Sequence, residues 1–205
     1  SDNQLLSAFV RWVLPHSGAE LYLEYGRDDH AYDFRDLVNE PDHSRTYMLG
    51  ARKVISSSPT YMSAIRGELM NYQLPTTVRH RDEGGIYLHG LIRQGHTQRG
   101  QMLGAPLGPG AAAGSTVAYD RYDPSGRLTV AWTRTVNQEA GLFYRTGVQS
   151  RSSMDVTHSL SVERLLFRGP LDITAGGTVS REFSRNFSSD ALNVSAVLGA
   201  RYNIR

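Results

Sequence analysis

Cysteine is absent from the 205 residues, and lysine occurs only once, at Lys53. The first absence excludes disulfide frameworks and thiolate metal sites. The second means that arginine supplies nearly all of the positive charge, and the formal net charge is only +2. Because the arginines are scattered and mostly interleaved with acidic residues, no basic nucleic-acid-binding tract is present, and we expect no nucleic-acid partner.

Long apolar runs are also missing. No segment approaches the ~20 apolar residues that a membrane-spanning helix needs. The N-terminus lacks the basic and apolar segments of a signal peptide, which fits either a cytoplasmic protein or a mature or truncated chain. A transmembrane β-barrel remains compatible with these absences, because barrel strands alternate apolar and polar residues and escape hydropathy analysis.

Apolar residues recur at every second position in about nine segments, which predicts an all-β chain with antiparallel strands. In the first segment, Leu6, Ala8, Val10, Trp12 and Leu14 share one face. The positions between the apolar residues are rich in Ser, Thr, Gly, Glu and Arg, which suits a water-filled lumen. The alternating segments are 6–14, 19–25, 47–51, 61–69, 117–121, 128–132, 156–162, 171–179 and 192–202.

Three features favour a transmembrane β-barrel over a soluble β-sandwich or barrel, in which strands also alternate. Several segments are closer to the ~9–11 residues of membrane barrels than to the ~5–6 usual in soluble sheets. Short turns alternate with long loops, as they do between the two sides of the outer membrane. Aromatic residues near strand ends predict interfacial belts: Trp12, Tyr22, Tyr25, Tyr47, Tyr61 and Trp132.

An odd number of strands is unusual for a complete bacterial barrel. Residues 1–205 are therefore interpreted as a single β-barrel domain or as the C-terminal part of a larger one. Two segments interrupt the strand pattern: an acidic loop at 28–44, and a long segment at 73–114. Within the second, we expect a short helix in 87–103 and irregular backbone in the region rich in Gly and Pro that follows.

These two segments carry a family resemblance. The stretch from Glu24 to His30, continuing through Arg35-Asp36-Leu37 to 40–45, resembles a characteristic motif of the Wzi capsule-assembly family. The stretch Gly95–Gly110 resembles the family's second motif, and the resemblance covers residues 1–205 as the C-terminal half of such a protein. It implies an outer-membrane barrel of 18 strands that attaches capsular polysaccharide at the cell surface and behaves like a lectin.

The acidic loop supplies most of the candidate ligand-binding residues. Three interpretations stay open: a metal site, an ion-pair network with Arg27, Arg35 and Arg45, and a carbohydrate contact in which Tyr32 or Phe34 stacks on a sugar. The spacing matches neither an EF-hand nor an HExxH helix, so no metal is expected. The candidates in this loop are Asp28, Asp29, His30, Arg35, Asp36, Asp42 and His43.

The second motif adds Arg93, His96 and Arg99 as ligand-binding candidates. Arginine forks bind carboxylates with two hydrogen bonds, which suits anionic sugars such as uronates. The polar strand positions Glu24, Arg52, Arg66 and Glu68 form a further group, which we interpret as an ion-pair lattice bracing the wall rather than as ligand contacts.

Catalytic machinery is not recognisable. The chain has no Gly-x-Ser-x-Gly elbow and no Walker-type loop. Its acids have abundant arginine neighbours, which lower carboxylate pKa values instead of raising one for acid catalysis. We therefore expect no enzyme activity, no catalytic residue and no cofactor.

The sequence thus predicts a non-enzymatic protein of the bacterial outer membrane that binds or anchors capsular or other surface polysaccharide. Its expected partners are that polysaccharide and outer-membrane lipid, and the full-length barrel is expected to be monomeric. Two alternatives remain: a porin-like outer-membrane channel, and a soluble β-sandwich that binds carbohydrate.

Overall fold

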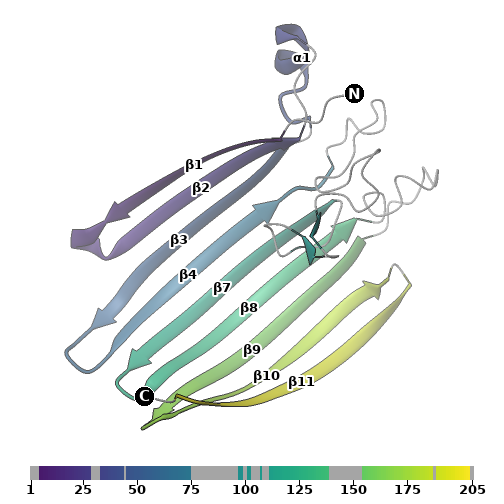
Figure 1. Cartoon of the computed structure of the whole chain (residues 1–205). Helices are drawn as coiled ribbons and strands as arrows, with labels where there is room; N and C mark the ends of the chain where they lie inside the picture. Colours follow the sequence, from purple (N-terminus) through teal and green to yellow (C-terminus); the bar gives the residue numbers. More distant parts are fainter. Residues whose placement is uncertain are drawn as a thin grey trace.

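The nine alternating segments all form strands of one antiparallel sheet (Figure 1). The computed structural model describes residues 5–28, 33–43, 45–74, 97–98, 101–102, 107, 111–138, 154–186 and 188–203. The strands are β1 (Leu5–Leu14), β2 (Ala19–Asp28), β3 (Arg45–Ser57), β4 (Met62–Asn71), β7 (Ala112–Asp123), β8 (Gly126–Gln138), β9 (Met154–Arg168), β10 (Leu171–Arg185) and β11 (Ser189–Tyr202).

The sheet is an open meander. Its strand order is β1-β2-β3-β4-β7-β8-β9-β10-β11, so each strand lies beside those that precede and follow it along the sheet-forming part of the chain. β1 and β11 form the two edges and do not pair with each other (Figure 1). The predicted all-β antiparallel fold with about nine strands is therefore confirmed, whereas the described residues do not close into a barrel.

The register keeps apolar and polar residues on opposite sides of the sheet. We call one side the apolar face. One row across it joins nine directly paired residues: Trp12, Leu21, Ala51, Gly67, Val117, Trp132, Leu160, Val179 and Val194. We call the other side the polar face. A row across it joins Arg11, Tyr22, Gly50, Glu68, Thr116, Thr133, Ser159, Ser180 and Asn193.

Burial differs from that of a soluble protein, because large apolar side chains on the apolar face lie uncovered. On the apolar face, Trp12, Leu160 and Val194 are 62%, 55% and 74% exposed. On the polar face, Asp120 is only 3% exposed. Within the described residues, no second layer covers the apolar face. The buried apolar residues there are mostly small: Ala64, Tyr72, Ala111, Ala112, Ala118 and Val136.

The connections divide the sheet into two unlike ends (Figure 1). At the short-turn end, strands are joined by residues 15–18, 58–61, 124–125 and 169–170. Gly126 closes the β7–β8 turn with a φ of 141°, and a Cβ there would lie 1.9 Å from the Leu165 carbonyl oxygen. At the long-connection end, residues 29–44, 72–111 and 139–153 separate the strands, and only the β10–β11 connection is short. The predicted alternation of short and long connections is confirmed for the first seven connections.

The register shows on which face of the sheet several residues of the predicted aromatic belts lie. Tyr25 and Tyr47 are directly paired on the apolar face near the long-connection end, and Trp12 lies on the same face near the short-turn end. Tyr22 is the exception, because its register places it on the polar face, where its hydroxyl bonds to Glu68. Its assignment to an apolar belt was wrong.

The two irregular segments contain regular structure. A short helix, α1 (Phe34–Asn39), projects beyond the long-connection end (Figure 1). It begins where the Asp33 side chain accepts a hydrogen bond from the Asp36 backbone at 2.8 Å, as helix N-caps do. Within 87–103, β5 (Thr97–Gln98) pairs with β6 (Gln101–Met102), so these four residues are not in the expected helix. The rest of that range lies outside the described residues. Among the described residues, no helix is long and apolar enough to cross a membrane.

Candidate functional site

The polar face of β2–β4 is organised around Tyr22. Its hydroxyl donates a 2.6 Å hydrogen bond to Oε2 of Glu68, although β3 lies between the two strands. The ring passes over Gly50, where a Cβ would lie 1.9 Å from the Tyr22 Cζ atom. A glycine is therefore required at this position for the side chain to cross from β2 to β4.

A buried carboxylate lies on β7. Oδ2 of Asp120 accepts a 2.8 Å hydrogen bond from Nε of Arg66, and Oδ1 accepts a 2.7 Å bond from the Thr129 hydroxyl. Both oxygens are thus satisfied from the neighbouring strands β4 and β8. Because an unpaired buried carboxylate is costly, these two bonds fix the register of three strands.

Further polar pairs extend this network to both sides. Arg11 binds Glu20 through two hydrogen bonds of 2.8 and 2.9 Å. Arg127 donates a 2.7 Å hydrogen bond to Glu163. Ion pairs are therefore present on the polar face, but of the predicted group Glu24, Arg52, Arg66 and Glu68 only Arg66 takes part in one among the described residues. Glu24 accepts from Ser7, and Arg52 forms no hydrogen bond or ion pair among the described residues.

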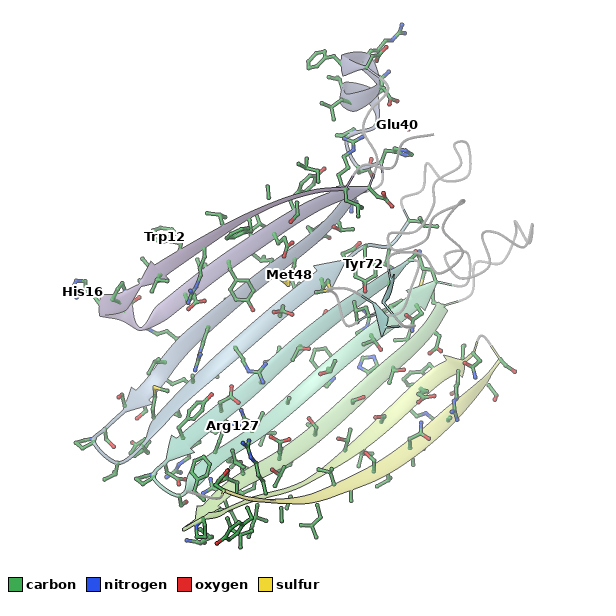
Figure 2. The ribbon with its side chains drawn as sticks, in the orientation of Figure 1. Trp12, His16, Glu40, Met48, Tyr72 and Arg127 are labelled. Atoms are coloured by element: carbon green, nitrogen blue, oxygen red, sulfur yellow. The ribbon has the colours of Figure 1, made fainter. Side chains whose placement is uncertain are left out.

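A shallow pocket of about 470 Å³ opens on the polar face of β1–β4. Met48 and Trp12 mark the two sides of this part of the sheet, since their registers place them on the polar and the apolar face respectively (Figure 2). The pocket combines three arginines with two glutamates, a tyrosine and a phenylalanine. Its polar-face lining residues are Phe9, Arg11, Glu20, Tyr22, Glu24, Met48, Arg52 and Arg66.

The acidic loop lies at the long-connection end, as the position of Glu40 in Figure 2 shows. Two candidate residues there are buried, with Asp28 8% and His43 7% exposed. Asp42 lies 3.7 Å from Arg45, an ion pair that the arginine-network interpretation anticipates. Among the described residues no group of three His, Cys, Asp or Glu side chains is arranged to hold a metal ion.

The helix α1 carries two further candidates. Arg35 is exposed and Asp36 half-buried on it, next to Phe34, which is 79% exposed. An exposed aromatic ring beside polar groups is suited to stacking on a sugar. The remaining five candidates, namely Asp29, His30, Arg93, His96 and Arg99, lie outside the described residues.

At the short-turn end a separate cluster holds the β7–β8 turn. The Ser125 hydroxyl donates to Asp123, and Nη2 of Arg164 donates a 3.1 Å hydrogen bond to Oδ2 of Asp123. The hydrogen bond from Ser125, followed by that from Arg164, keeps the pKa of the Asp123 carboxyl below its ordinary value. A carboxylate held ionised in this way serves as a structural anchor rather than as a proton donor.

Sequence reasoning missed Tyr22 and Asp120 as organising residues of the polar face. Alternation places both on that face, but only the strand register shows which residues are their partners. No protein-family model, no curated protein and no solved structure matches the chain.

Proposed function

We propose that the sheet forms part of the wall of a bacterial outer-membrane β-barrel that binds surface polysaccharide without catalysing a reaction. The observation that carries the proposal is the uncovered apolar face. Large apolar side chains are exposed on the apolar face of all nine strands, while ion pairs and hydroxyl pairs occupy the polar face. Lipid is the solvent that suits the first face, and a wet lumen suits the second.

A soluble protein would not tolerate this surface easily. The largest apolar patch on a typical soluble monomer covers a few hundred Å², whereas here exposed apolar residues run across the whole sheet from Trp12 to Val194. The strands are 10 to 15 residues long, enough for tilted strands to cross a bilayer. The short-turn end and the long-connection end then correspond to the periplasmic and outer sides.

In this proposal, further strands complete the wall at the two free edges of the sheet. Edge strands expose unpaired backbone groups, which lipid cannot satisfy. Closure therefore requires strands beyond the nine that the structure describes. The resemblance to the Wzi family sets the expected total at about 18 strands in one monomeric barrel.

The ligand class rests on the same resemblance together with two local features. Phe34 offers an exposed ring beside Arg35 and Asp36 at the long-connection end. The polar face offers a pocket lined by arginine, glutamate and aromatic side chains. Both groups of residues suit sugar hydroxyls, carboxylates and ring faces.

The membrane part of the proposal is tested by fractionation. The full-length protein, produced in a Gram-negative host, should co-purify with outer membranes and should require detergent for extraction. It should also migrate faster on a gel before boiling than after, as folded barrels do. Recovery of a folded, detergent-free soluble protein would instead support the β-sandwich alternative.

The ligand part is tested on a glycan array with detergent-folded protein. Saturable binding to bacterial surface polysaccharides is expected, and the variant Arg93→Ala/Arg99→Ala should bind less if the second motif contacts the ligand. Absence of glycan binding by folded protein, combined with steady conductance in planar bilayers, would favour the porin-like alternative.

A further inference from the structure

Arg52 is the exception in the charge pairing of β1–β4. Arg11 and Arg66 each bind a carboxylate, at 2.8 Å from Glu20 and 2.8 Å from Asp120. Arg52, between them on β3, has no such partner among the described residues. It is directly paired with Glu20 on β2, but that carboxylate is already held by Arg11.

The other neighbour of Arg52 makes its position less favourable. Arg66 on β4 is the directly paired residue, and like charges in opposed positions of neighbouring strands destabilise a sheet. Two charges offset part of this repulsion, because Asp120 binds Arg66 and the charge of Arg52 also acts on Glu20. The nearby acids already accept hydrogen bonds, Glu24 in the pocket from Ser7 and Glu68 beside it from Tyr22. A cation in this environment has its hydrogen-bond donors available for an external anion.

The pocket beside Arg52 also holds an aromatic surface. Phe9 lies on the polar face of β1 and is 83% exposed, although its position alternates with the apolar positions of that strand. Phe9 on β1 is directly paired with Glu24 on β2, and Glu24 is directly paired with Met48 on β3. Met48 lies four residues before Arg52 on the same strand. Four residues of strand span about 13 Å, so the Phe9 ring and the guanidinium of Arg52 are separated by more than one sugar ring.

We propose that Phe9, Glu24 and Arg52 form a subsite for an acidic oligosaccharide on the polar face. In this subsite, Phe9 stacks on the apolar side of one ring, Glu24 accepts hydrogen bonds from hydroxyl groups, and Arg52 binds the carboxylate of a uronate unit further along the chain. The volume of about 470 Å³ is of the size of small-molecule sites, which span ~300–1,000 Å³. The subsite rests on the proposed function and adds a charge class to its ligand.

The guanidinium of Arg52 is suited to this role because its planar fork matches a carboxylate with two parallel hydrogen bonds. An incoming carboxylate would also neutralise the repulsion between Arg52 and Arg66. Binding therefore gains from the ligand contact and from relief of an unfavourable pairing in the free protein.

The test is calorimetric titration of detergent-folded full-length protein with oligogalacturonate, beside its methyl ester. The acid should bind, and the ester should bind about tenfold or more weakly, because it retains the rings and hydroxyls but lacks the charge. Arg52→Met should weaken binding of the acid to the level of the ester, while Arg52→Lys should retain part of the preference. Phe9→Ala should weaken both ligands, and Phe9→Trp should restore them.

The matched control is Arg201→Met. Arg201 also lies on the polar face, but on the opposite edge strand β11. Because Arg52 makes no bond within the described residues, Arg52→Met is expected to fold, which gel mobility before boiling verifies. Equal affinity of wild type and Arg52→Met for the acid, or an equal loss in Arg201→Met, would overturn the subsite. If the protein binds neutral glycans but not the acid, the subsite is overturned and the proposed function stands. If the protein binds no glycan at all, both the subsite and the proposed function are overturned.

Discussion

The hydroxyl of Tyr22 lies 2.6 Å from Oε2 of Glu68, two strands away across β3. The bond exists because Gly50 leaves space for the ring directly above the backbone of β3. One side chain thereby ties three strands together on the polar face. This arrangement makes Gly50 as necessary to the contact as the two bonding residues.

Gly50→Ala should destabilise the protein by about 1–3 kcal/mol, because the new methyl group would displace the Tyr22 ring and break its bond to Glu68. The measurement is the urea midpoint of unfolding in lipid vesicles. Gly67→Ala on β4 is the control, since its Cβ would meet nothing closer than 3.8 Å.

A double-mutant cycle isolates the cause. In a Tyr22→Ala background there is no ring to displace, so Gly50→Ala should be nearly neutral. An equal effect of Gly50→Ala in both backgrounds would show that the glycine acts through the backbone instead.

The buried carboxylate of Asp120 gives a second prediction. Arg66→Met should cost about 1–3 kcal/mol of stability, because Asp120 is 3% exposed and would lose its positively charged partner. Adding Asp120→Leu should recover part of the loss, since the unpaired charge is then removed. Additive losses in the double variant would contradict a direct pairing.

The strands and their two faces could be predicted from the sequence, because the period of two does not depend on distant contacts. Trp12, Leu21 and Val179 share a face in the sequence pattern, and the pairings place them in one row. The partners on the polar face could not be predicted. The bond between Tyr22 and Glu68 depends on the register of three strands and on the absence of a side chain at Gly50.

The acidic loop shows a different limit. The pattern there was dominated by charge, and the helix α1 was not predicted. A signal was nevertheless present, because Asp33 precedes the helix as an N-cap and Asp36 follows three residues later. The burial of Asp28 and His43 carried no local signal, since it arises from chain segments that meet only in the folded protein.

Neighbouring residues of β9 test the lipid-facing assignment. Leu160→Arg on the apolar face should cost about 2–4 kcal/mol of vesicle-inserted stability, as Arg does near the middle of a bilayer. Ser161→Arg on the polar face should cost clearly less, because its side chain would face the lumen. Folding into vesicles is measured by gel mobility before boiling. Equal yields for the two variants would argue against lipid contact, since Leu160 is already 55% exposed and a soluble sheet would accept arginine there.

The turn cluster gives a pH prediction at the short-turn end, outside the central part of the strands. The hydrogen bonds from Ser125 and Arg164 lower the pKa of Asp123, so its contribution to stability is complete above the ordinary carboxyl pKa of ~3.9. It disappears as the pH falls through the lowered folded-state pKa, because the proton then binds the unfolded chain more readily.

Wild type should therefore exceed Asp123→Asn in stability at about pH 6 and lose this advantage progressively on acidification below ~3.9. Urea unfolding of both proteins across this range measures the difference, with Arg164→Met expected to reduce it and Ser125→Ala to reduce it further. A difference that stays constant with pH would mean that the Asp123 carboxylate contributes nothing through its charge, and that the asparagine acts on the geometry of the turn alone.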